Sequence, residues 1–186
     1  MAYIRVKKIR TKKGSVYSYA YLVENRYRKR KGGARQKVLA YLGKVYTFAV
    51  DSRLSFEVPE EVDAAAFVEQ FGYKGVVKKL AGFELLRHGF SFADGSYSQD
   101  GIIATVGDSG IMFGNEAGND KVVLAFNEGF LCKKTYLDLL KFTAESDDPH
   151  DVGVAFGNAV LEAGIGIPKN VFVALFQKVS GLELDH

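Results

Sequence analysis

Charge is divided very unevenly along this chain. The first 50 residues contain fourteen lysines and arginines and a single acid, Glu24, which gives them a formal charge of +13. The other 136 residues contain eleven basic and twenty-one acidic side chains, a formal charge of −10, so the whole-chain value of +3 conceals two opposite segments. Like charges held close together repel one another unless a polyanion neutralises them. The sequence therefore predicts a basic segment that binds nucleic acid, followed by an acidic one.

Composition excludes several classes of protein. A hydrophobic content of 47% indicates a folded chain rather than a disordered one. No apolar run approaches the ~20 residues that span a bilayer, and the first residues alternate polar with apolar, unlike a secretory signal. Cys132 is the only cysteine, so neither an intrachain disulfide nor a multi-cysteine zinc site can form. We expect a cytoplasmic protein with no membrane contact, no cofactor and no bound metal.

Periodicity divides the chain near its first proline, Pro59. Before it, β-branched and aromatic residues alternate with polar ones, which predicts strands over 3–10, 16–23 and 35–42, and a short one over 45–50. After it, helices are predicted over 60–71, 74–88, 133–143, 150–163 and 169–180, and strands over 90–93, 101–106, 110–113 and 121–127. The fold class is α+β: a small basic antiparallel β module over 1–50, then an acidic mixed α+β domain over 56–186.

Strand parity separates the β module into two faces. The aliphatic face collects Ile4, Val6, Val16, Ala20, Leu22, Val38, Ala40 and Leu42. The other face collects Tyr3, Arg5, Lys7, Tyr17, Tyr19, Tyr21, Arg35, Lys37 and Tyr41. Tyrosines flanked by cations are typical of single-strand binding platforms, on which bases stack while cations hold phosphates. The same side chains suit a sheet that enters a major groove, and the tyrosines also suit packing on the second domain.

A basic run follows the second predicted strand, in the loop over 26–33. Such runs are often solvated surface, but this one lies between two strands beside Gly32 and Gly33, so phosphate contact is favoured. The predicted nucleic-acid-binding residues are Arg5, Lys7, Tyr17, Tyr19, Tyr21, Arg28, Lys29, Arg30, Lys31, Arg35, Lys37 and Tyr41.

The β module also resembles a known family. The segments Ala2-Tyr3-Ile4-Arg5, Tyr19-Ala20-Tyr21-Leu22-Val23-Glu24 and Arg35-Gln36-Lys37-Val38, with Tyr41-Leu42-Gly43, are similar to the N-terminal β-rich module of DDE insertion-sequence transposases, especially archaeal ones. The resemblance covers about 43 residues, ends at Gly43 and implies DNA binding. The rest of the chain shows no credible triad of catalytic acids, so no transposition chemistry is carried over.

The acidic domain looks weakly like the restriction-endonuclease-like fold of archaeal junction resolvases. Glu84 and Asp100 fill two of the acid positions of that fold, which binds Mg²⁺. Its Glu-x-Lys pair is missing, because Ala125 and Asn127 stand there and Glu128 is out of phase. His150 among nearby aspartates is better explained by helix capping, His88 by a favourable position at a helix C-terminus, and Cys132 by burial.

The predicted function is non-enzymatic nucleic-acid binding, with DNA favoured. An RNA- or ribosome-associated protein is one alternative, and a degenerate Mg²⁺-dependent nuclease-like protein is another. The acidic domain is expected to bind a protein partner or a second copy of the chain.

Overall fold

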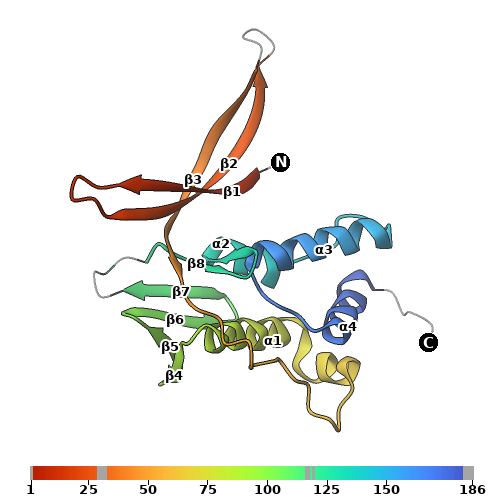
Figure 1. The fold of residues 1–186 in the computed structure, drawn as a ribbon. Helices are drawn as coiled ribbons and strands as arrows, with labels where there is room; N and C mark the ends of the chain where they lie inside the picture. Colours follow the sequence, from red (N-terminus) through yellow and green to blue (C-terminus); the bar gives the residue numbers. More distant parts are fainter. Residues whose placement is uncertain (1, 29–32, 116–117, 119, 182–186) are drawn as a thin grey trace.

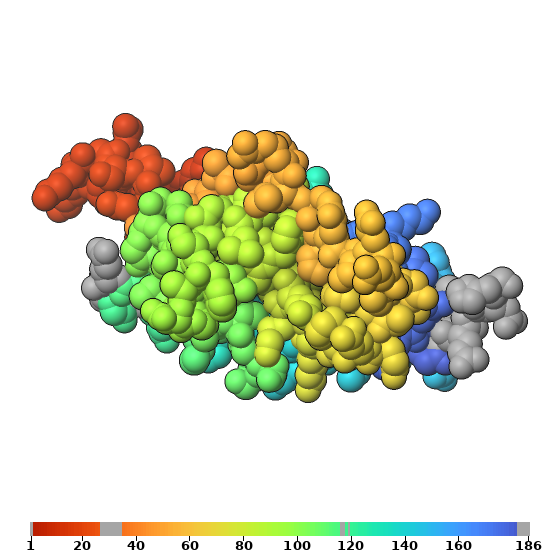
Figure 2. Space-filling model, turned by 90° about the horizontal axis from the view of Figure 1, so that it is seen from below, coloured from red at the N-terminus to blue at the C-terminus, as the bar shows by residue number. Residues whose placement is uncertain are grey.

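The computed structural model describes residues 2–28, 33–115, 118 and 120–181. It consists of a β arm and a body, with the arm projecting away from the body (Figure 1). The arm comprises strands β1 (Ala2–Arg10), β2 (Val16–Arg28) and β3 (Gly33–Thr47). Figure 2 shows the β1–β2 hairpin, in red, protruding beyond one end of the body.

The arm is built from two antiparallel hairpins that share β2. β1 pairs with β2 from Ala2↔Glu24 to Arg10↔Val16, and β2 pairs with β3 from Tyr19↔Lys44 to Arg28↔Gly33. The β1–β2 turn is closed by a hydrogen bond from Thr11 N–H to the Ser15 carbonyl. β2 and β3 extend past the start of β1 and form a two-stranded ribbon there. The three predicted strands are confirmed, and the second and third are longer than alternation indicated.

A short parallel pairing joins the arm to the body. β3 lies beside β8 (Val122–Phe126), with Lys44 opposite Val122 and Thr47 opposite Ala125. β8 pairs in turn with β9 (Gly129–Leu131), so the sheet has the order β1-β2-β3-β8-β9. The fourth strand predicted over 45–50 is instead the end of β3, which stops at Thr47, so the prediction is wrong for residues 48–50.

The described part of the body contains a second sheet and four helices, and the α+β fold class is confirmed (Figure 1). The antiparallel sheet has the order β4-β5-β6-β7. Its strands are β4 (Ser91–Ala93), β5 (Ser96–Gln99), β6 (Ile102–Gly107) and β7 (Gly110–Asn115), and the helices are α1 (Ala64–Arg87), α2 (Lys133–Leu140), α3 (Pro149–Ala163) and α4 (Lys169–Ser180).

Helix α1 runs through the main hydrophobic core. Its side chains Leu80 and Leu85 are fully buried together with Ile102 of β6, Leu124 of β8 and Phe156 of α3. The core therefore lies between the small sheet, the body end of the large sheet and the helices. Because burial of this kind stabilises a fold in proportion to its apolar area, the body supplies most of the stabilisation, and the arm supplies little.

Most helix boundaries follow the sequence signals. Gly72 has a φ of 65° and breaks α1 between Phe71 and Tyr73, which agrees with the two helices predicted there. Asp148 caps α3 and Pro149 opens it, as predicted. The start predicted at Glu60 is wrong: α1 begins at Ala64, and the Asp63 carboxylate accepts the hydrogen bond of Ala66 N–H.

Two glycines of the body provide a matched test of packing. A Cβ at Gly129 would overlap the Leu161 carbonyl oxygen, so Gly129→Ala is expected to lower the free energy of unfolding by about 1–3 kcal/mol. Gly157 lies within α3 with open space around it, so Gly157→Ala is expected to raise the same quantity by about 0.5–1 kcal/mol. Urea unfolding of both variants measures the difference. If both substitutions changed the free energy of unfolding equally and in the same direction, the close approach of β9 to α3 would be contradicted.

Candidate nucleic-acid interface

Strand register divides the arm into two faces, because residues paired across neighbouring strands point to the same side. We call the side that holds the paired residues Arg5↔Tyr21 and Lys7↔Tyr19 the tyrosine face, and the other side the outer face. Tyr41 pairs with Tyr21 and Lys44 with Tyr19, so both belong to the tyrosine face. The parity assignment of β1 and β2 is confirmed.

The assignment is wrong for the distal half of β3. The β2–β3 register shifts twice, so that neither Leu42 nor Leu39 has a partner on β2. Past the second shift, Lys37 pairs with Glu24 and Arg35 with Arg26, both of which lie on the outer face. A bulge inserts one extra residue and reverses the direction of every side chain beyond it.

Aromatic rings on the tyrosine face pack on one another. The Tyr41 ring centroid lies 5.4 Å from that of Tyr21 and 6.3 Å from that of Tyr19, in tilted arrangements. Tyr41 is only 37% exposed, and burial, with smaller contributions from Tyr19 and Tyr21, raises its pKa. The rings form a half-buried cluster instead of a row of free ring faces.

Cations of the tyrosine face lie over these rings. Lys7 Nζ is 5.1 Å from the Tyr21 centroid, and Lys44 Nζ is 4.6 Å from the Tyr17 centroid. Such cation–π contacts favour fixed positions for the ammonium groups. Lys121, from the body, reaches within 5.6 Å of the Tyr41 centroid.

Arg5 takes part in a polar network on the same face. Its guanidinium donates to Gln36 Oε1, and the Gln36 amide donates in turn to the Tyr3 hydroxyl. Tyr3 donates to Asn25 Oδ1 at 3.4 Å. The network ties the start of β1 to both strands of the ribbon.

The outer face combines a small apolar cluster with exposed cations. Ala20, Val123 and Cys132 are buried there, against Ile4, Leu42, Val45 and Phe130. The outer-face cations of the arm are Lys8, Arg10, Arg26, Arg35 and Lys37, all of them exposed. Arg26 Nε lies 2.8 Å from a Glu24 carboxylate oxygen, and no other ion pair forms among the described side chains of residues 2–26 and 35–47. The outer-face positive charge is therefore largely uncompensated.

The basic run lies mostly outside the described residues. Lys29, Arg30 and Lys31 belong to the segment that the structure does not describe, and Arg28 is placed as the last residue of β2. Their predicted contact with phosphate stays a prediction.

The acids of the nuclease alternative do not form a site. Glu84 is fully buried, and its Oε1 accepts the Gly166 N–H at 2.8 Å. Asp100 is exposed in the tight turn between β5 and β6. The strands that the junction-resolvase arrangement needs as neighbours, β6 and β8, lie in different sheets. Within the described part of the chain, no three His, Cys, Asp or Glu side chains come together as a candidate metal site.

Buried charge at the end of α1 was not expected from the sequence. His88 is 4% exposed and stacks on Phe126 with 3.8 Å between ring centroids, so its interpretation as a simple helix-terminus partner is incomplete. Its Nδ1 lies 3.5 Å from Glu84 Oε2, and Arg87 Nη1 lies 3.6 Å from Glu84 Oε1. The i, i+3 and i+4 spacing of these residues was the available signal.

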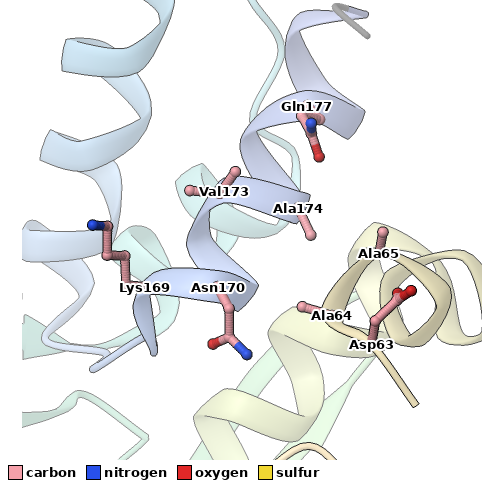
Figure 3. Close-up of a pocket in the computed structure, with 8 residues that line it drawn as sticks. All are labelled: Asp63, Ala64, Ala65, Lys169, Asn170, Val173, Ala174 and Gln177. Carbon is pink, nitrogen blue, oxygen red and sulfur yellow. The ribbon is translucent and has the colours of Figure 1, made fainter. Parts of the chain in front are cut away.

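The remaining candidates have structural roles. Asp148 accepts the His150 N–H at 2.8 Å, which confirms capping there, and Cys132 is buried at the start of α2. A groove of about 670 Å³ lies between the start of α1 and one side of α4 (Figure 3). It is lined by Asp63, Ala64, Ala65, Lys169, Asn170, Val173, Ala174 and Gln177, which present no nucleophile with an adjacent base. No described helix is long and apolar enough to cross a membrane.

Glu84 is expected to be a structural residue. Glu84→Ala removes the acceptor of Gly166 N–H and the carboxylate beside Arg87 and His88, although His88 Nδ1 keeps the Glu84 backbone carbonyl at 2.9 Å, so the free energy of unfolding should fall by about 2–3 kcal/mol. Asp100→Asn is the control: Asn tolerates the φ of 46° found there, and a change of at most about 0.5 kcal/mol is expected. Chemical denaturation measures both. A neutral Glu84→Ala would refute the buried network.

Comparison with known proteins places the arm in a family context. Residues 4–61 match the model of a family described as IS1634 family transposase, N-terminal domain. No curated protein and no solved structure matches the chain. The match confirms the resemblance of the basic segment to an insertion-sequence transposase module, and it corrects the expected end of that resemblance at Gly43, because it continues through the connection to α1. The N-terminal part of this chain is thus similar to the N-terminal domain of IS1634 family transposases.

Proposed function

We propose that this protein binds DNA through the β1–β3 arm, as part of a transposition system and without catalysing a reaction itself. The observation that carries the proposal is the uncompensated charge of the arm: fourteen basic residues lie in the first 50, and the one arm acid, Glu24, is paired with Arg26. The family match, named for a transposase N-terminal domain, supports DNA as the polyanion.

Duplex DNA suits the arm better than a single strand. Base stacking requires aromatic faces that are free to receive bases, and each stacked base contributes about 1–3 kcal/mol. Here the rings of Tyr21 and Tyr17 already have lysine ammonium groups over them, and Tyr41 packs on Tyr21. Phosphate contact through exposed cations needs no such free ring. It also positions a protein on a duplex without reading its sequence.

The acidic body is proposed to serve as an interaction module. Its net charge of −10 disfavours contact with a phosphate backbone, so the body is expected to lie away from the DNA. Self-association or binding of a protein partner remains the proposed role. No described feature of the arm favours RNA over DNA.

A salt series tests the proposal. Binding of the full chain to duplex DNA, single-stranded DNA and structured RNA is measured between 50 and 200 mM salt. If six to ten phosphates are contacted, duplex affinity should fall by about 10³–10⁵-fold across this range, through counterion release. Absence of duplex binding at 50 mM salt, or tighter binding of structured RNA, would contradict the DNA assignment.

The exposed lysines of the β1–β2 turn provide a charge-matched comparison. The double variant Lys12→Gln/Lys13→Gln should weaken duplex binding and lower the salt slope by about 2, since each lost phosphate contact reduces the slope by about 1. The double variant Lys133→Gln/Lys141→Gln removes the same charge from exposed positions of the body and should leave the slope unchanged. Equal effects of the two variants would show that net charge alone, rather than the arm, determines affinity.

A further inference from the structure

We propose that duplex DNA contacts the outer face of the arm, opposite the tyrosines, and that Lys8, Arg10, Arg35 and Lys37 bind its phosphates. This inference rests on the proposed DNA binding and specifies which side of the arm performs it. It differs from the expectation drawn from strand parity alone, which placed Arg35 and Lys37 beside the tyrosines.

The first argument is the availability of the cations. On the tyrosine face, Arg5 donates to Gln36, and Lys7 and Lys44 lie over rings. A phosphate on that side would have to displace these contacts. On the outer face, Lys8, Arg10, Arg35 and Lys37 are exposed, and none of them pairs with a carboxylate of the described chain. Lys8, Arg10 and Arg35 can reach a phosphate without losing an internal partner of the described chain, and Lys37 would give up only a Coulombic attraction to Glu24 that is weaker than that of Arg26.

The second argument is the position of the body. Tyr46 shares the tyrosine face with Lys44 and pairs with Leu124, whose side chain lies in the main core. The main core of the acidic body therefore lies on the tyrosine side of the large sheet. Among the described residues, the body reaches the outer face through the small cluster in which Val123, Phe130 and Cys132 pack with Ala20. A duplex on the outer face of the arm lies on the side opposite the main core of the acidic body, which reduces electrostatic repulsion.

The third argument is spacing. Lys8 and Arg10 lie near the β1–β2 turn, whereas Lys37 is level with the start of β1 through the pairings Ala2↔Glu24 and Glu24↔Lys37. Arg35 lies two residues further along the ribbon, so at ~3.3 Å per residue the two groups of cations are separated by about 20–33 Å along the strands. This span is shorter than one helical turn of B-DNA, about 34 Å. Because the two hairpins run in different directions (Figure 1), this span is an upper limit on the distance between the groups, so both are within reach of a single duplex.

Glu24 is the one acid on this face, and Arg26 holds it. The Arg26 guanidinium lowers the pKa of Glu24, so the carboxylate stays ionised at neutral pH and compensates one cation. Glu24→Gln leaves a side chain of similar shape and releases that cation. On the outer-face assignment, Glu24→Gln should tighten duplex binding about threefold or more at 100 mM salt, whereas unchanged or weaker binding would count against it.

Protection of lysines from acetylation by bound DNA distinguishes the two faces in the chain without substitutions. The full chain is acetylated with and without a 20-base-pair duplex, and each lysine is quantified by mass spectrometry. Lys8 and Lys37 should be protected at least fivefold by the duplex, and Lys7 and Lys44 should change by less than twofold. Protection of Lys7 and Lys44 without Lys8 and Lys37 would overturn the face assignment while leaving DNA binding intact. If no lysine on either face is protected and the duplex does not bind, the proposed function itself is refuted.

Substitution provides the second measurement. The variant Lys8→Gln/Arg10→Gln/Arg35→Gln/Lys37→Gln is expected to lose at least 100-fold in duplex affinity at 100 mM salt. Circular dichroism and thermal unfolding establish that the variant folds. Because the substituted side chains are exposed, we expect the spectrum and the unfolding temperature to be unchanged. The body variant Lys133→Gln/Lys141→Gln, measured in parallel, sets the effect of a general loss of charge. A folded quadruple variant that binds as well as the parent would refute the inference.

Discussion

The parallel pairing of β3 with β8 is the interaction on which the arrangement of the molecule depends. It extends only from Lys44↔Val122 to Thr47↔Ala125, yet it attaches the whole arm to the body. Gly43 makes the approach possible: its φ is +148°, and a Cβ there would overlap the Lys121 carbonyl oxygen. Lys44 N–H donates to that same oxygen at 3.1 Å. Parallel strands require a long crossover, and here it contains the connection after β3, α1 and the entire small sheet.

This pairing also explains how the chain tolerates so much positive charge in a thin sheet. The arm has little core of its own, so its stability comes from its strand ladders and from its attachment to the body. The tyrosine face places cations over ring faces or beside an amide, which lowers their mutual repulsion. On the outer face, the charges remain in solvent and are screened by salt. A polyanion would replace that screening, and this links the architecture to the proposed binding.

Local signals predicted much of the fold. The alternation in β1 and β2, the break at Gly72 and the Asp148–Pro149 helix start all depend on neighbouring residues, and they are confirmed. The partnership of β3 with β8 joins segments about 75 residues apart, and no local pattern specifies it. Burial of Glu84 is equally non-local, because its hydrogen-bond donor is Gly166. The alternation of residues along a strand carries no information about these contacts between distant segments.

The most important error in assigning side chains to faces by strand alternation arises at a single residue of β3. Leu39 has no partner on β2, and the bulge there turns Val38 toward the tyrosine face and Lys37 toward the outer face. With uninterrupted alternation beyond Tyr41, Arg35 and Lys37 would join Arg5 and Lys7, and the cations would be concentrated on the side that faces the acidic body. The bulge instead groups them with Lys8 and Arg10. Bulges also increase local twist, which fits the different directions of the two hairpins (Figure 1). One inserted residue thus determines which side of the arm can approach a polyanion.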